Sequence, residues 1–235
     1  MSSELAKRIF TSVILLIVTF SFLIYANEDY FLGLIIIVGI LCYYEWIITN
    51  DLLLDKFRKG FESYITEIFN KNFLKFLSIY LFGFIYFLLI LPLSAFYFRV
   101  EVSLNFFLLI LIICIFSDIG GYVFGKTIGG KKLTKISPNK TISGSIGSFI
   151  LPIVFIYLIN IKIYFFELNL SNILFILFVS LISQLGDLFF SYFKRLNNKK
   201  NTSNLLPGHG GLLDRIDGLV IVLPIIFLIK IMEIF

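Results

Sequence analysis

Long apolar runs separated by short polar connections dominate the pattern along the chain. A transmembrane helix needs about 20 predominantly apolar residues, because each residue advances it by about 1.5 Å. The runs that reach or approach this length are 9–26, 31–49, 73–98, 104–124, 147–166, 170–193 and 213–235. We therefore predict an all-α, polytopic integral membrane protein with about seven transmembrane helices. The long run 73–98 contains Pro92, which predicts a tilt or a break in that helix.

Composition agrees with a chain whose main solvent is lipid. Of the 235 residues, 59% are hydrophobic and 15% are charged, and the mean hydropathy is +0.97. Soluble domains are about 45–50% apolar and about 25% charged. A single soluble core could not bury this much apolar surface, which excludes the ordinary soluble classes. Without an internal repeat, residues 1–235 are expected to form one integral-membrane domain. The first run lacks a small-residue cleavage site and is expected to be retained.

Basic residues lie mainly in alternate connections between the apolar runs. Sixteen of the 20 lysines and arginines precede the first run or lie in the connections 50–72, 125–146 and 194–215. Connections rich in lysine and arginine face the cytoplasm. The N-terminus and these three connections are therefore predicted to be cytoplasmic.

The segment GGYVFGKT, residues 120–127, matches the phosphate-loop pattern G-x-x-x-x-G-K-[ST]. That pattern has its mechanical meaning only where a strand leads into a glycine loop and then a helix. Here an apolar run precedes the segment and a lysine-rich turn region follows it, so we predict no phosphate-loop fold. Lys126 and the glycines remain candidates for contact with phosphate.

Aspartates lie within or beside the apolar runs, namely Asp118, Asp187, Asp214 and Asp217. A carboxylate inside a membrane span is costly and usually functional. On a helix, Asp187 shares one face with Ser191 and Lys194, and Arg195 lies one position further. The alternative for Asp187 is an ion pair that merely holds two helices together.

The segment PGHGGLLDRID, residues 207–217, combines a glycine loop with the start of an apolar helix. Free backbone N–H groups at a helix start suit an anionic phosphate. Asp214 and Asp217 are three residues apart on one face and would repel each other unless a cation lay between them. Oxygen ligands favour a hard ion, so we predict Mg²⁺, with a second cation left open. A structural ion pair with Arg215 is the alternative.

His209, the only histidine, is a catalytic candidate in the same loop. Its side chain could serve as a general acid or base, because its unperturbed pKa is near 6.5. It could equally anchor the loop or donate a hydrogen bond to phosphate, and these two interpretations are favoured, because a phosphate nucleophile is already anionic.

Residues 117–147 form a second stretch with potential for chemistry. Asp118, Tyr122 and Lys126 share one helical face, and lysines, glycines and the Ser137-Pro138 turn follow. A basic, glycine-broken loop suits a polyphosphate, and it also suits anionic lipid headgroups, at about 1 kcal/mol per basic residue. Ordinary cytoplasmic bias explains some of the lysines but not the glycine, serine and proline around them.

Together, residues 184–218 and 117–147 resemble the phosphatidate cytidylyltransferase family. The signature of that family is matched by Ser191, Lys194, Arg195, Lys200, Ser203, Leu206, Pro207, His209, Gly210, Gly211, Asp214, Arg215 and Asp217. Its upstream S-P-x-K-T-x-x-G region is matched by Ser137, Pro138, Lys140, Thr141 and Gly144. The chain departs from the family at Asn201 and Ser143, where the family has acids.

The resemblance implies transfer of CMP from CTP to phosphatidic acid at the cytoplasmic face of a bacterial cytoplasmic membrane, by a homodimer without nucleic-acid partners. It implies that Asp187 and Asp214 hold Mg²⁺ with support from Asp217 and Asp118. The residues expected to contact the substrates are Tyr122, Lys126, Ser137, Lys140, Thr141, Lys194, Arg195, Lys200, Gly210, Gly211 and Arg215. Three alternatives stay open: a CTP-dependent lipid kinase of the dolichol or phytol kinase kind, an ion-coupled transporter with Asp118 and Asp187 as relay acids, and a non-catalytic membrane scaffold.

Overall fold

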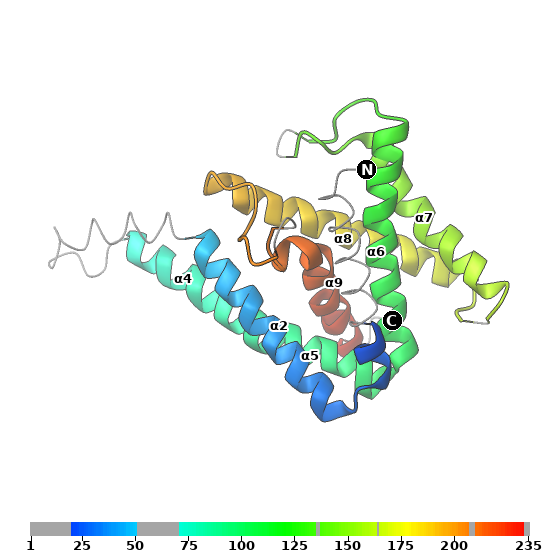
Figure 1. Cartoon of the computed structure of the whole chain (residues 1–235), viewed down its shortest axis with the longest axis horizontal. Helices are drawn as coiled ribbons and strands as arrows, with labels where there is room; N and C mark the ends of the chain where they lie inside the picture. The colour runs from blue at the N-terminus through cyan, green and yellow to red at the C-terminus, as the bar shows by residue number, and fades with distance from the viewer. Residues whose placement is uncertain (1–19, 51–70, 135–136, 164, 207–209, 233–235) are drawn as a thin grey trace, which may run out of the picture.

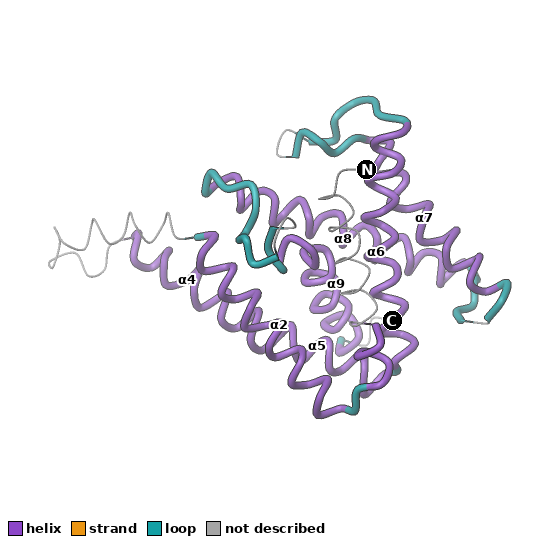
Figure 2. Tube along the Cα trace, in the orientation of Figure 1, coloured by secondary structure: helices purple, strands orange, loops and turns teal. Residues whose placement is uncertain are grey.

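The computed structural model describes residues 20–50, 71–134, 137–163, 165–206 and 210–232, and every regular element in these ranges is a helix (Figures 1 and 2). The α-helices are α2 (Glu28–Thr49), α4 (Lys71–Ile85), α5 (Leu91–Phe96), α6 (Leu104–Thr127), α7 (Ile142–Asn160), α8 (Leu170–Leu196) and α9 (Leu213–Ile231). Two π-helical segments, η1 (Tyr86–Ile90) and η2 (Tyr97–Val102), flank α5. The prediction of an all-α protein is confirmed for the described residues.

Five helical stretches are long and apolar enough to cross a membrane. They are Glu28–Thr49, Leu77–Val102, Leu104–Thr127, Ile142–Asn160 and Leu170–Leu196, and they match five of the predicted runs. Most of the first predicted run, 9–26, lies outside the described residues. The last run forms α9 as expected, but α9 is not among the five, since it carries Asp214, Arg215, Asp217 and Lys230 within 19 residues.

The helix that contains Pro92 does not break at the proline. It runs from Lys71 to Val102 as α4, η1, α5 and η2 without interruption. Proline removes one backbone donor, and its ring crowds the carbonyl four residues earlier. The wider η1 turn directly precedes it, and at its end the N–H of Leu91 donates to the carbonyl of Tyr86, five residues back. A π turn of this kind absorbs the misfit and lets the helix continue.

Helix α9 occupies the interior of the arrangement. It contacts α5, α6 and α8, while α2 lies along the α4–α5 helix and α6, α7 and α8 pack against one another (Figure 1). The hydroxyl of Tyr86 donates to the carbonyl of Val220 at 2.9 Å, which fastens the α4–α5 helix to α9. Helix α9 also packs along α8, and its start, which carries two aspartates, lies beside Lys194 of α8.

Close packing of α6 on α7 explains the glycines of GGYVFGKT. All eight residues lie within α6, so the expectation that they form no phosphate loop is confirmed. A Cβ atom on Gly120 would overlap the carbonyl oxygen of Gly147 and lie 2.7 Å from its carbonyl carbon. A Cβ atom on Gly144 would lie 2.6 Å from the carbonyl oxygen of Gly121. Small residues let membrane helices approach this closely, so these glycines serve helix packing.

The Gly120→Ala variant is expected to lose about 1–3 kcal/mol of stability, because its methyl group meets backbone atoms that cannot rotate away. Thermal unfolding of purified protein in detergent measures the loss. Gly33→Ala on α2 is the matched control, since nothing lies within 4 Å of a Cβ atom there. Equal unfolding temperatures for the two variants would contradict the packing role of Gly120.

Candidate functional site

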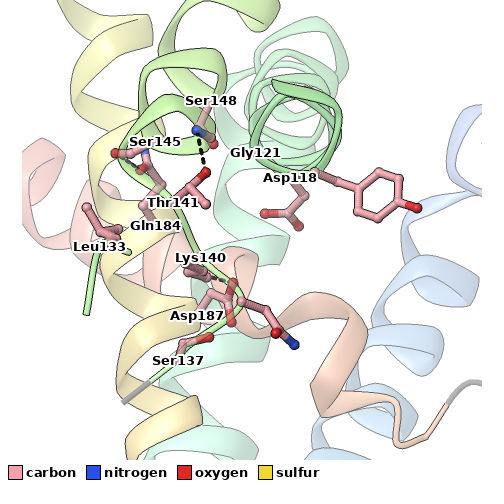
Figure 3. Close-up of a pocket in the computed structure, with 13 residues that line it drawn as sticks. Asp118, Gly121, Leu133, Ser137, Lys140, Thr141, Ser145, Ser148, Gln184 and Asp187 are labelled. Carbon is pink, nitrogen blue, oxygen red and sulfur yellow. Dashed lines mark hydrogen bonds and ion pairs between the residues drawn. The ribbon is translucent and has the colours of Figure 1, made fainter. Parts of the chain in front are cut away.

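A polar cavity of about 320 Å³ lies between α6, α7 and α8 (Figure 3). It is lined by Asp118, Gly121, Tyr122, Leu133, Ser137, Asn139, Lys140, Thr141, Gly144, Ser145, Ser148, Gln184 and Asp187. Asp118 and Asp187 reach it from different helices, and the loop before α7 supplies Lys140. The cavity therefore joins two stretches that the sequence analysis singled out separately.

Asp187 and Lys140 form an ion pair across this polar cavity. The hydroxyl of Ser191 also donates to Asp187, at 3.3 Å, as the i, i+4 spacing predicts. The side chains of Lys140 and Asp187 are 26% and 29% exposed. The pair links α8 to the loop before α7, so it could also serve the purely structural role that was the alternative for Asp187. It also remains accessible from the cavity, so a substrate phosphate can reach the ammonium group.

The loop before α7 is organised to present Lys140. The N–H of Lys140 donates to the carbonyl of Ser137 at 3.1 Å, and the carbonyl of Lys140 accepts from the N–H of Leu133 at 2.8 Å. Thr141 then caps α7, because its hydroxyl accepts from the N–H of Gly144 at 3.1 Å. Ser143, one of the two departures from the family pattern, donates to the carbonyl of Gly129. A carboxylate at this position could not make that bond, so the serine here anchors the loop.

Asp214 forms a second polar centre at the start of α9. Its Oδ1 lies 2.7 Å from the Nζ of Lys194, and its Oδ2 accepts from the N–H groups of Thr202 at 2.9 Å and Gly211 at 3.0 Å. These three bonds join α8 to the loop between α8 and α9, whose described residues are 197–206 and 210–212 and which is called the signature loop below.

The backbone N–H groups at the start of α9 are already occupied, which corrects the sequence-based expectation that they are free for phosphate. The N–H of Gly211 donates to Asp214, and those of Leu212 and Leu213 donate to the carboxylate of Glu45 at 2.8 and 2.7 Å. Negative charge is favourable at a helix start, and here the protein supplies it. Pro207, Gly208 and His209 lie outside the described residues.

Glu45 was not identified by the sequence analysis. It lies on α2, is fully buried, and accepts four hydrogen bonds, from Thr202, Ser203, Leu212 and Leu213. The signal that could have found it is the one that found Asp187: a single acid in the middle of an apolar run.

Asp217, three residues after Asp214, is held by a different hydrogen bond. Asp217 is 6% exposed and accepts from the N–H of Gly218 at 2.9 Å. The charges of Asp187, Asp118 and Lys194 act on it. Among the described residues, no three acids, histidines or cysteines are gathered tightly enough to make a ready metal site.

Of the other residues expected to contact the substrates, some line this polar cavity and some do not. Tyr122, Ser137 and Thr141 line it. The Nζ of Lys126 lies 3.2 Å from the hydroxyl of Tyr122, and the side chain of Arg195 donates to the carbonyl of Lys199 at 3.0 Å.

The signature loop places two further expected residues away from the polar cavity. Lys200 lines a separate groove beside Tyr44. Gly210 has a φ of 84°, a conformation that glycine adopts readily, and lies beside Asn201 and Asp214. An aspartate in place of Asn201 would put a second carboxylate next to Asp214, so the amide at this departure avoids a repulsion.

An apolar cavity of about 430 Å³ runs between α2, α5, α6 and α9. The described residues that line it are almost all apolar, and Asp118 and Arg215 are the only charged ones among them. Asp118 also lines the polar cavity, so a single carboxylate borders both spaces.

The described part of the chain therefore combines five candidate membrane spans with a polar cavity that contains Lys140 and an apolar cavity that shares Asp118 with it. The chain is a member of the cytidylyltransferase family, whose model matches residues 61–232.

Several relatives of the chain carry the name phosphatidate cytidylyltransferase. The Rickettsia bellii protein is 40% identical over 149 residues, which cover 60% of this chain and 64% of the relative. The Staphylococcus haemolyticus protein is 41% identical over 130 residues, covering 53% and 48%. The Rickettsia conorii protein is 37% identical over 150 residues, covering 60% and 65%. The matches thus span between about half and just under two thirds of the length of these relatives.

Proposed function

We propose that the protein is a phosphatidate cytidylyltransferase, which converts CTP and phosphatidic acid into CDP-diacylglycerol and pyrophosphate. The observation that carries the proposal is the position of Asp118 between the polar and the apolar cavity. A water-soluble nucleotide and a lipid can meet only where two such spaces adjoin. The family of the chain and the names of its relatives support the same reaction.

In this reaction an oxygen of the lipid phosphate attacks the α-phosphorus of CTP. The new P–O bond forms as the bond from the α-phosphorus to the bridging oxygen breaks, and pyrophosphate leaves with that electron pair. Such a transfer depends chiefly on positioning and on neutralising charge. Lys140, with Ser137 and Thr141 beside it, is suited to the phosphates of CTP. Arg215, the only basic residue among the described residues that line the apolar cavity, is suited to the lipid phosphate.

The remaining signature residues receive roles within this proposal. Lys194 would hold Asp214 in place in the resting site and face phosphate during transfer. Tyr122 and Lys126 would border the nucleotide, and Gly210 and Gly211 would keep the loop close to it. Arg195 and Lys200 would contribute positive charge at the mouth of the site. His209 remains a candidate phosphate donor.

The donor chemistry of the site fits Mg²⁺, because its acids offer only oxygen ligands and two of them, Asp118 and Asp187, line the same cavity. We propose that Asp187 and Asp214 hold the ion, with Asp217 and Asp118 in support. Each of the two carboxylates has a lysine as its counter-charge, and a divalent cation would replace that charge. When bound, the metal would neutralise phosphate oxygens and polarise the α-phosphorus.

Lysine and arginine bias between the spans supports a cytoplasmic N-terminus and a site that faces the cytoplasm. The relatives are bacterial, which supports a bacterial cytoplasmic membrane as the location. The homodimer is proposed from the family resemblance alone.

Isotope labelling of CTP tests the proposal. Purified protein in lipid nanodiscs with phosphatidic acid, Mg²⁺ and CTP labelled at the α-phosphorus is expected to yield labelled lipid. CTP labelled at the γ-phosphorus is expected to yield only labelled pyrophosphate, and a chelator should stop both. In a parallel assay with dolichol or phytol in place of phosphatidic acid, label from the γ-phosphorus in that lipid would instead identify a lipid kinase. Ion-driven uptake into proteoliposomes without any labelled lipid would identify a transporter.

A further inference from the structure

The carboxylate of Glu45 joins two segments that are far apart in the chain. Its Oε1 accepts from the hydroxyl of Ser203 at 2.7 Å and from the N–H of Leu212 at 2.8 Å. Its Oε2 accepts from the hydroxyl of Thr202 at 3.0 Å and from the N–H of Leu213 at 2.7 Å. One side chain of α2 therefore holds both the signature loop and the start of α9.

The C-terminal end of α2 reinforces this connection. The hydroxyl of Thr49 lies 3.4 Å from the carbonyl of Thr202, and the ammonium of Lys199 donates to the carbonyl of Ile48. The side-chain amide of Asn197 lies 3.4 Å from that of Asn50. These contacts follow Glu45 at the C-terminal end of α2, so the loop 197–203 is docked along the last turn of that helix.

A fully buried carboxylate is tolerated only where hydrogen bonds replace its lost water. Glu45 has four, which fill both oxygens, and two of them come from backbone groups at a helix start, where negative charge is favoured. The arrangement has no room for a side chain at Gly211, where a Cβ atom would overlap the hydroxyl of Thr202 and lie 2.5 Å from Oε2 of Glu45.

The loop held by Glu45 also determines where Asp214 points. Thr202 gives its hydroxyl to Glu45 and its backbone N–H to Asp214. Gly211, packed against Glu45, gives its N–H to Asp214 as well. Two of the three groups that hold the Asp214 carboxylate are therefore fixed in turn by Glu45.

We propose that Glu45 is a positioning residue that fixes the signature loop and, through Thr202 and Gly211, the orientation of Asp214. Glu45 lies before residue 61, where the match to the family model begins, so the family core is completed by a side chain from outside it. The catalytic consequence rests on the proposed function, whereas the effect on loop order does not.

The Glu45→Gln variant tests this inference, because it keeps the size of the side chain but replaces one acceptor with a donor that faces other donors. Amide hydrogen exchange at 199–206 and 210–213 is expected to speed up by about tenfold, while exchange in α6 and α7 stays unchanged. The kcat for labelled-lipid formation is expected to fall by about tenfold to 100-fold, with the KM for CTP changing far less. Glu28→Gln is the matched control, an exposed acid in the first turn of the same helix.

The two readouts separate failure of this inference from failure of the proposed function. Unchanged exchange in Glu45→Gln overturns the inference, and faster exchange with unchanged kcat reduces Glu45 to a structural contact. A wild-type protein that forms no labelled lipid refutes the proposed function, yet the exchange comparison still decides the role in loop order. Should Glu45→Gln not fold, Ser203→Ala removes the bond to Glu45 together with the bond that Ser203 accepts from the N–H of Leu205. It is expected to give a smaller increase in exchange at 210–213, which Leu205 does not contact through this hydroxyl; no increase at 210–213 overturns the inference.

Discussion

Asp187→Asn is expected to reduce formation of CDP-lipid by about 100-fold or more, which is the scale for losing one preorganised electrostatic group. The substitution keeps the size of the side chain but removes the charge that pairs with Lys140 and is proposed to bind Mg²⁺. Both members of the ion pair are more than a quarter exposed, so its loss should cost little stability. Initial rates with α-labelled CTP and the thermal unfolding midpoint are the two measurements.

Asp29→Asn is a suitable control for this variant, because Asp29 is an exposed acid in the first turn of α2. It should retain full activity and the same unfolding midpoint. If Asp187→Asn kept most of its activity, Asp187 would be a structural partner of Lys140 and the proposed metal ligands would be wrong.

Asp214→Ala is expected to abolish turnover and also to destabilise the protein. The change leaves Lys194 without its partner and two backbone N–H groups, of Thr202 and Gly211, without an acceptor. Removing one partner of a buried ion pair costs about 3–5 kcal/mol, and the lower end applies here because each side chain keeps about a tenth of its exposure. Thermal unfolding and the labelled-lipid assay together measure both effects.

A double substitution separates the structural role of Asp214 from its catalytic role. Lys194→Met combined with Asp214→Asn removes both charges at once, so part of the lost stability should return. Activity should not return, because the proposed metal ligand is still missing. Recovery of activity along with stability would show that Asp214 acts only through Lys194.

The long apolar helices, which are the candidate membrane spans, could be predicted because their signal is local. Each depends on about 20 successive residues, and the runs around Ile35, Ile110 and Phe178 show it without any knowledge of their neighbours. The helical spacing of Asp187 and Ser191 was equally readable and gave a real hydrogen bond. Asp118, Lys140 and Asp187 were named as site residues from the sequence, and the structure brings them to one cavity.

What the sequence did not reveal depends on partners far away in the chain. The N–H groups before Asp214 looked free, since nothing nearby in the sequence occupies them, and their acceptor Glu45 lies 168 residues before Leu213. Spacing alone could not show which donors hold each acid: Asp214 accepts from Lys194, Thr202 and Gly211, whereas Asp217 accepts from the N–H of its neighbour Gly218. The glycines of GGYVFGKT matched a phosphate-binding pattern. In the structure they lie on α6 and pack against α7, a contact that the local sequence does not show.

The bond pattern of Glu45 has a consequence for how this chain can change over evolutionary time. Its carboxylate accepts from the hydroxyls of Thr202 and Ser203, and it leaves no space for a side chain at Gly211. These residues depend on one another although they lie in two distant segments of the chain. A substitution in one segment is tolerated only with a matching change in the other, so the two should covary among homologues. For the same reason, we expect a chimera to lose these bonds if its α2 comes from a relative with a different residue at position 45. The loop at Thr202 and Ser203 would then have no acceptor on α2.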